Sequence, residues 1–304
     1  MNENTRFLKM VYKDDQFVDP SLNEEVDIGF IFCDPIKTVD HMMYRKFLDG
    51  SREEVSNTTM VQYREQVLSQ LQLSRTNIKK RVVIDTDDRA LYLPGVFDFF
   101  GDKVDLFLKK EYRRTHTYSY SDKVKPFSFT SHYYPHLIEF YEDRFTESPL
   151  TRINECVWVG TPWSRMEVGM PDEWVNRKDY IEILTRSGSI KTLGFAPRPE
   201  YLKNFRKYKM CLHLNGSGQK CHRFFEALAQ NCLLIQQEMD TLNSFPGDFH
   251  ELTIFRTPYE AIEKINILKS DIGAYKEAHQ KQVEIVEKYH SPEYIRKYIN
   301  ELLF

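Results

Sequence analysis

The stretch from Cys211 to Gln237, CLHLNGSGQKCHRFFEALAQNCLLIQQ, has the residue types of an anion-binding site. A short apolar run meets a glycine-containing turn, a helical pattern follows from about Lys220 to Gln230, and a second apolar run closes the stretch. A loop of this kind leaves the first backbone N–H groups of the helix without carbonyl partners, so that a phosphate can bind there. The residues that we expect around the anion are Asn215, Gly216, Ser217, Gly218, Lys220, Arg223 and Glu226.

Arg223 and Glu226 lie three residues apart, so a cation and a carboxylate share one face near the positive end of this helix. The pair suits a nucleoside diphosphate, because Arg223 and the backbone amides would hold the phosphates while Glu226 accepts hydrogen bonds from ribose hydroxyls. The alternative is a βαβ unit with a glycine turn, an Arg–Glu pair on the surface and nothing bound. A single Gly-x-Gly does not decide between them.

A second group of polar residues follows the apolar run in RVVIDTDDR, from Arg81 to Arg89, which ends in Asp85, Asp87 and Asp88. Ligands of open α/β sheets bind at the carboxyl ends of strands, and carboxylate oxygens suit Mg²⁺ or Mn²⁺. Asp85-Thr86-Asp87 after an apolar strand also resembles the pattern with which metal-dependent glycosyltransferases hold a divalent ion. The alternative is a solvated acidic loop in which Asp85 or Asp88 caps the next helix.

A basic run follows a short predicted strand in Asp105 to Arg114, DLFLKKEYRR. Its cations are Lys109, Lys110, Arg113 and Arg114. They could meet an anionic acceptor or nucleotide, although runs of this kind usually form a solvated face.

Composition bounds the class of protein. The 304 residues carry 42 Lys and Arg against 45 Asp and Glu, a net charge of 42 − 45 = −3, which argues against a nucleic-acid partner. Five cysteines without C-x-x-C spacing indicate reduced thiols and a cytoplasmic protein. Because no apolar stretch suits a signal peptide or a spanning helix, we expect no transmembrane segment.

The order of elements predicts an α/β protein of two domains with a boundary near residue 150. The first domain opens with a strand at Val26–Cys33 and an amphipathic helix at Ser56–Leu73. From Thr151 onward strands alternate with helices, which indicates a parallel sheet wound on both faces. The expected strands are 155–160, 190–195, 209–214, 232–235 and 252–256, and the expected helices are 174–185, 199–207, 220–230, 258–269 and 274–304 with a break at 291–292.

Four segments in series carry a resemblance to a known family: VWVGTPWSR, KTLGF, YLKNFRKYKMCLHLNGSG and RFFEALAQNCLLIQQ. Between Val157 and Gln237, about a quarter of the chain, the series resembles the nucleotide-sugar domain of GT-B glycosyltransferases. Within that fold it is most similar to the exostosin-like enzymes and to the capsule-associated O-glucosyl/xylosyltransferases. Their helix after the glycine turn carries a motif comparable to Arg223–Ala229.

This resemblance implies two Rossmann-like domains that face each other across a cleft. Residues 1–150 would bind the acceptor and residues 151–304 the donor, with a last helix that returns to the first domain. The donor would be a UDP-sugar or similar nucleotide-sugar, the acceptor a glycan or glycoprotein, and no metal would be obligatory. The implied donor ligands are Arg223 for phosphate, Glu226 for ribose and the loop Asn215–Gly218, with Gly160, Thr161 and Arg165 on the side that faces the first domain.

An inverting transfer needs a base for the acceptor hydroxyl, and cations or helix amides for the leaving diphosphate. Our candidates for the base are Asp85, Asp87 and Asp88, with Asp34 in reserve. A retaining enzyme would need no such base. Two other functions stay open: a metal-dependent GT-A transferase that uses Asp85 and Asp87, and a nucleotide- or glycan-binding module without catalysis.

Overall fold

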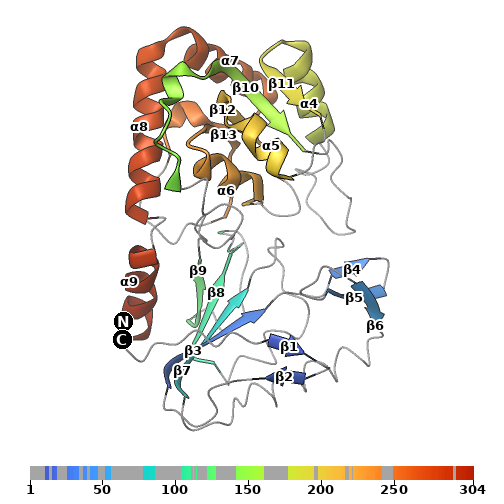
Figure 1. The fold of residues 1–304 in the computed structure, drawn as a ribbon, viewed down its shortest axis with the longest axis vertical. Helices are drawn as coiled ribbons and strands as arrows, with labels where there is room; N and C mark the ends of the chain where they lie inside the picture. The colour runs from blue at the N-terminus through green and yellow to red at the C-terminus, as the bar shows by residue number, and fades with distance from the viewer. Residues whose placement is uncertain are drawn as a thin grey trace.

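A computed structural model gives the fold of the chain (Figure 1). The residues that it describes are 11–13, 16–18, 26–33, 37–39, 42–46, 52–55, 78–85, 104–110, 112, 114, 122–127, 142–160, 177–194, 198–215, 219–220, 222–241, 249–289 and 292–304. The helix predicted at Ser56–Leu73 lies outside these residues.

The C-terminal half is built on a parallel sheet with the strand order β11-β10-β12-β13-β14. Its strands are β10 (Ile153–Val159), β11 (Ile190–Leu193), β12 (Tyr208–His213), β13 (Leu233–Gln237) and β14 (Ile254–Phe255). Its helices are α4 (Arg177–Arg186), α5 (Arg198–Phe205), α6 (His222–Ala229), α7 (Pro258–Ser270), α8 (Ile272–Tyr289) and α9 (Pro292–Leu303). The strands expected from the sequence are thus present, although β14 has two residues and a 3-10 turn (Glu251–Thr253) takes the start of the expected run.

Helices cover both faces of this sheet. On one face α5 and α6 pack their apolar side chains against Val157, Val159 and other buried strand residues. On the other face α4 and α7 pack against Cys156 and Trp158. The strand residues at the centre of the sheet, such as Val157, Trp158, Leu212 and Leu234, are apolar and buried, as a parallel sheet that is covered on both faces requires.

The last strands and helices follow local signals in the sequence. Thr257 caps α7, since its side chain accepts from the Glu260 N–H and Pro258 stands at the first helical position. At the end of α6, Asn231 adopts a positive φ of 52°, and the buried Arg152 donates from Nη1 to the carbonyls of Gln230 (2.8 Å) and Asn231 (3.1 Å). The first contact stabilises the start of α7, and the second stabilises the end of α6.

The N-terminal half contains a second parallel sheet with the order β3-β7-β8-β9. Its strands are β3 (Val26–Cys33), β7 (Ile78–Asp85), β8 (Leu106–Lys109) and β9 (Val124–Pro126). Small antiparallel units join β1 (Val11–Lys13) with β2 (Gln16–Val18), and β4 (Lys37–Val39) with β5 (Met42–Lys46) and β6 (Arg52–Val55). The strands β4, β5 and β6 were not expected from the sequence.

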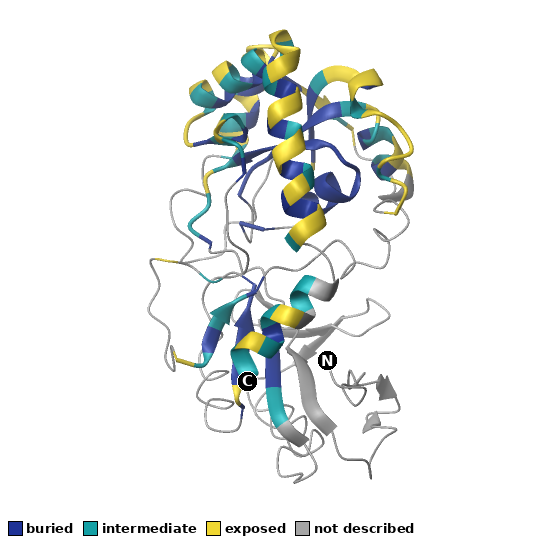
Figure 2. Cartoon of the chain, turned by 90° about the vertical axis from the view of Figure 1, so that its left-hand side faces the viewer, coloured by how far each residue is buried: buried dark blue, intermediate teal, exposed yellow. Residues whose placement is uncertain are grey.

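Contacts between described residues join the two halves of the chain. Helix α9 lies beside the N-terminal sheet (Figures 1 and 2), where the Tyr298 hydroxyl donates to the Pro126 carbonyl over 2.8 Å and Ile299 joins the core with Val82. The N–H of Arg114, after β8, donates to the carbonyl of Asp240, after β13, over 3.2 Å. The segments that leave the carboxyl ends of β8 and β13 therefore meet.

The predicted fold class, an α/β protein with two parallel, Rossmann-like sheets, is confirmed. Three cysteines have side chains that the structure describes: Cys156, Cys211 and Cys232. All three are buried free thiols, as the sequence indicated.

Candidate functional site

The carboxyl end of β10 is the point at which the C-terminal sheet changes direction. From β10 the chain moves to β11 on one side and later returns to β12 on the other. The helices that follow, α4 and α6, lie on opposite faces of the sheet. Ligands of open α/β sheets bind at such a switch point, outside the strand ends.

Arg223, in the first turn of α6, reaches across this switch point. Its Nε donates to the carbonyl of Val159 over 2.5 Å, and its Cζ lies 3.8 Å from the centre of the Trp158 ring. The side chain is only 9% exposed, and its Nη1 is buried without a hydrogen-bond partner among the residues that the structure describes. A buried cationic N–H without an acceptor is costly, so this atom marks a place where an anion would stabilise the protein.

Gly160 makes room for this guanidinium at the end of β10. Its φ is +135°, and a Cβ at this position would overlap Nη2 of Arg223 and lie 3.2 Å from Cζ. The absence of a side chain lets Arg223 cross from the α6 face of the sheet to Trp158, whose ring belongs to the core on the other face. Gly160 was predicted as a donor-site residue, and the geometry assigns it this role towards Arg223.

A second arginine approaches Trp158 from α4. The Cζ of Arg177 lies 5.5 Å from the centre of the Trp158 ring. Its Nε donates to the carbonyl of Asn215 and its Nη2 to that of Leu214, both over 3.1 Å. Arg177 therefore links the backbone of Leu214 and Asn215, after β12, to the indole ring on which Arg223 stacks.

Glu226 and Tyr201 complete a cluster of five side chains with Trp158, Arg177 and Arg223. Glu226 is 4% exposed, and its Oε2 accepts a hydrogen bond from the Tyr201 hydroxyl of α5. Burial, and then the adjacent carboxylate, raise the pKa of Tyr201, which keeps the phenol protonated as a donor. The interpretation of Arg223 and Glu226 as an exposed surface pair is wrong, because both side chains are buried and each contacts a different element.

The loop between β12 and α6 is tied to the sheet at its two ends. Asn215 is 3% exposed, its N–H donates to Oε1 of Gln237 and its Nδ2 to the Glu238 carbonyl, both over 3.2 Å, while its Oδ1 is buried without a partner. At the other end Oε1 of Gln219 accepts from the N–H (2.8 Å) and hydroxyl (2.6 Å) of Thr241. Lys220, a predicted donor ligand, is 2% exposed beside Gln219.

His213, the last residue of β12, is fully buried beneath this loop. Its Nε2 lies 2.6 Å from the Gln219 carbonyl, so this nitrogen carries the proton of the neutral ring. Burial, and then the positive charge of Arg223, lower the pKa of His213 to about 3. His213 is therefore an uncharged support of the loop at neutral pH.

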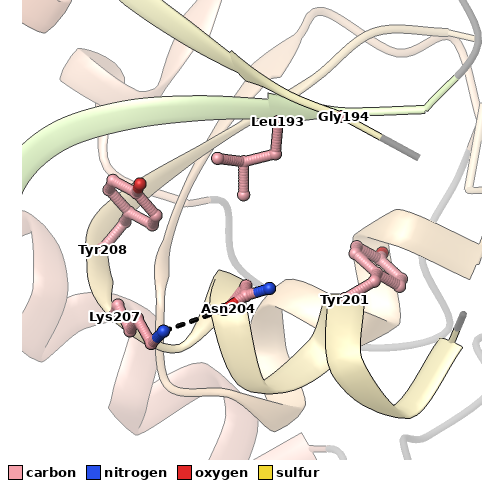
Figure 3. A pocket seen from close by; sticks show the side chains of 6 residues that line it. All are labelled: Leu193, Gly194, Tyr201, Asn204, Lys207 and Tyr208. Carbon is pink, nitrogen blue, oxygen red and sulfur yellow. Dashed lines mark hydrogen bonds between the residues drawn. The ribbon is translucent and has the colours of Figure 1, made fainter. Parts of the chain in front are cut away.

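A cavity of about 170 Å³ adjoins Tyr201 on the side of β11 (Figure 3). It is lined by Leu193, Gly194, Tyr201, Asn204, Lys207 and Tyr208. Lys207 donates to Oδ1 of Asn204 over 2.8 Å along its floor. The cavity thus lies between the edge strand β11 and helix α5.

The structure describes some of the remaining predicted residues and not others. Thr161, Arg165, Gly216, Ser217, Gly218, Asp87 and Asp88 lie outside the described residues, as does Arg113 of the basic run. The backbone of Asp85 ends β7 and pairs in register with Lys109 of β8. Lys109 and Lys110 are 0% and 2% exposed, so the interpretation of this run as a solvated face is wrong for both.

Three contributors to the site were missed at the level of sequence: Trp158, Arg177 and Tyr201. Trp158 had a signal, since it stands two residues before Gly160 in a strand that ends at the switch point. Arg177 and Tyr201 had no such signal in the sequence. They stand 19 and 43 positions after Trp158, and they reach the cluster only because α4 and α5 pack on the sheet. Within the described residues no group of three or more His, Cys, Asp or Glu side chains could hold a metal ion.

Comparison with known proteins adds a family. A family model described as "Glycosyl transferase-like" matches residues 144–301, which is more than half of the chain. The chain belongs to this glycosyl transferase-like family. The match contains the whole C-terminal sheet, the cluster around Arg223 and most of α9.

Solved structures resemble this glycosyl transferase-like chain only distantly, and no curated protein matches it. A GtfA/B complex bound to UDP and GlcNAc shares 10% identity over 88% of this chain with a TM-score of 0.39, and the match spans 65% of that chain. A DNA-modifying beta-glucosyltransferase, solved with and without uridine diphosphoglucose, shares 10% identity over 92% of this chain and 100% of its own, with a TM-score of 0.38. The family assignment rests on the family model alone. None of the helices that the structure describes has the length and apolar character needed to span a membrane.

Proposed function

We propose that this chain is a glycosyltransferase that moves a sugar from a nucleotide-sugar, most simply a UDP-sugar, to a glycan acceptor. The observation that carries the proposal is the buried Arg223 guanidinium, whose Nη1 has no partner, at the switch point of a sheet that lies within the family match. A guanidinium with one nitrogen left without an acceptor in such a position suits the diphosphate of an activated donor.

In this proposal Arg223 binds the diphosphate and stabilises the charge that develops on it as the sugar leaves. Stacking on Trp158 and the bond to the Val159 carbonyl hold the guanidinium in place before the ligand arrives, so little reorganisation is needed. Glu226, one turn further along α6, accepts from the ribose hydroxyls. The loop from Asn215 to Gly218 lies next to the diphosphate.

The acceptor and the catalytic base are proposed to come from the N-terminal half. Asp85 ends β7, and the segments that leave β8 and β13 meet at Arg114 and Asp240, so carboxyl ends of strands from both sheets approach the same region. We assign the base of an inverting transfer to Asp85, Asp87 or Asp88. Residues 1–150 would then bind the acceptor and residues 151–304 the donor, as in the exostosin-like and capsule-associated GT-B enzymes that the sequence resembles.

The test is a panel of nucleotide-sugars and free nucleotides, read first by thermal stabilisation and then by donor hydrolysis and transfer. A bound donor should raise the melting temperature, by an amount that grows with its concentration. Arg223→Gln should weaken binding of the diphosphate by about 10- to 100-fold, because a charged hydrogen-bonding partner is lost.

Arg186→Gln is the matched control, since Arg186 is an exposed helical arginine that pairs only locally with Glu182. It should leave donor binding unchanged. Circular dichroism confirms that each variant is folded. The proposal is wrong if no nucleotide stabilises the wild-type chain, or if Arg223→Gln binds the donor as well as the control does.

A further inference from the structure

The hydrogen bond between Tyr201 and Glu226 joins two helices that cover the same face of the C-terminal sheet. Tyr201 lies on α5 and Glu226 on α6, 25 residues apart in sequence. The Tyr201 ring also contacts the ring of Phe205, at a centroid distance of 6.1 Å, and Phe205 is fully buried. A contact with the core therefore supports the position of the phenol beside the carboxylate.

A carboxylate can accept from more than one donor at once. When ionised it has two oxygens with about four acceptor positions, and the Tyr201 hydroxyl donates to Oε2. Because a carboxylate accepts but cannot donate, any further ligand group must bring its own hydrogen. A diol is such a group.

The two ends of the cluster differ in chemistry. Arg223 presents a cation, and Glu226, three residues later, presents an anion that Tyr201 holds in one orientation. Tyr201 also forms the wall of the cavity beside β11, in which Tyr208 stands at the far end (Figure 3). A ligand that places phosphate at Arg223 would thus bring the adjoining sugar next to a carboxylate whose direction is set by Tyr201.

We propose that Tyr201 is a positioning residue that orients the Glu226 carboxylate towards the ribose hydroxyls of the donor nucleotide, and that it thereby sets the preference of the site for ribonucleotides. The inference rests on the proposed function, because it takes the ligand of this site to be a nucleoside diphosphate. It adds a residue that does not touch the ligand and acts through Glu226.

The test compares the dissociation constants of UDP and of 2′,3′-dideoxy-UDP, measured by calorimetry on the full chain. For the wild type we expect UDP to bind at least about 10-fold more tightly, since a hydrogen bond to a charged group is lost with the hydroxyls. Tyr201→Phe removes the phenol oxygen but keeps the ring on Phe205. This variant should bind UDP about 5-fold or more weakly and bind the dideoxy analogue within about 2-fold of wild type, because only the hydroxyl-dependent part is affected.

Tyr208→Phe is the matched control, as Tyr208 lines the same cavity and its hydroxyl has no hydrogen bond within the described part of the chain. It should keep the full preference, and Glu226→Gln should lose most of it. A general loosening of the fold would weaken both ligands equally, so equal losses in Tyr201→Phe overturn the inference, as does an unchanged preference. If wild type binds UDP without preferring it to the dideoxy analogue, only this inference fails. If wild type binds neither, the proposed function fails too.

Discussion

Gly160→Ala tests the geometry on which the donor site depends. The new Cβ would occupy the place of the Arg223 Nη2, and the residue would have to adopt a φ of +135°. The three atoms nearest to the added Cβ belong to the side chains of Arg223 and Trp158, and Arg223 is by far the closer, so the guanidinium is the part that must move. The contacts at risk are the bond to the Val159 carbonyl and the stacking on Trp158.

The expected cost can be built from these parts. A hydrogen bond from a charged group contributes about 1.5–3 kcal/mol and a cation–π contact about 0.5–2 kcal/mol. A positive φ costs a residue with a side chain about 1–2 kcal/mol. Since the arginine will recover part of these contacts elsewhere, we expect the free energy of unfolding to fall by about 2–4 kcal/mol, and UDP affinity to fall with it.

Gly188→Ala separates strain from displacement. Gly188 also has a positive φ, of +72°, but nothing lies within 4 Å of its Cβ position. Urea unfolding should therefore show a loss of only about 1–2 kcal/mol for this variant, and UDP binding should match that of wild type. If Gly160→Ala is no less stable than Gly188→Ala and binds UDP normally, Arg223 does not depend on the space at Gly160, and our account of the site is refuted.

Three further predictions concern pH, metal dependence and the last helix. Burial lowers the pKa of His213 to about 3, from 6.5 in the unfolded chain, so between these pH values only the unfolded state binds the extra proton. The free energy of unfolding should therefore fall as the pH drops from 6.5 towards 3, by up to about 1.4 kcal/mol per pH unit. His213→Gln should flatten this dependence in urea titrations, and equal slopes would contradict the assignment. Sugar transfer should survive excess EDTA, whereas a loss of activity that Mn²⁺ restores would favour a metal site formed by Asp85 and Asp87. Tyr298→Phe should lower the free energy of unfolding by about 0.5–1.5 kcal/mol, because the hydrogen bond to the Pro126 carbonyl is lost. Tyr259→Phe is the control and should cause no change, since Tyr259 is 70% exposed. Equal stability of the two variants would show that this bond does not hold α9.

The sequence by itself determined the order of strands and helices in the C-terminal half and two members of the site. Apolar runs of four to six residues between helical patterns predict a parallel sheet, because both of its faces must be covered. The helix expected from residue 258 and the break expected at 291–292 match the starts of α7 and α9, where Pro258 and Pro292 stand, since the effect of proline acts within one turn. Arg223 and Glu226 were predicted as a pair because their spacing on one helix is a local property.

The tertiary structure decided what these residues do. Trp158 comes 65 positions before Arg223, and no pattern in the sequence shows that its ring would lie under the guanidinium. Tyr201 meets Glu226 only because α5 and α6 pack side by side on one face of the sheet. Lys109 appeared as part of a solvated basic run, yet it is buried. Burial and contact between distant residues depend on how whole elements pack, and that is why the partners of each charged group appear only in the folded chain.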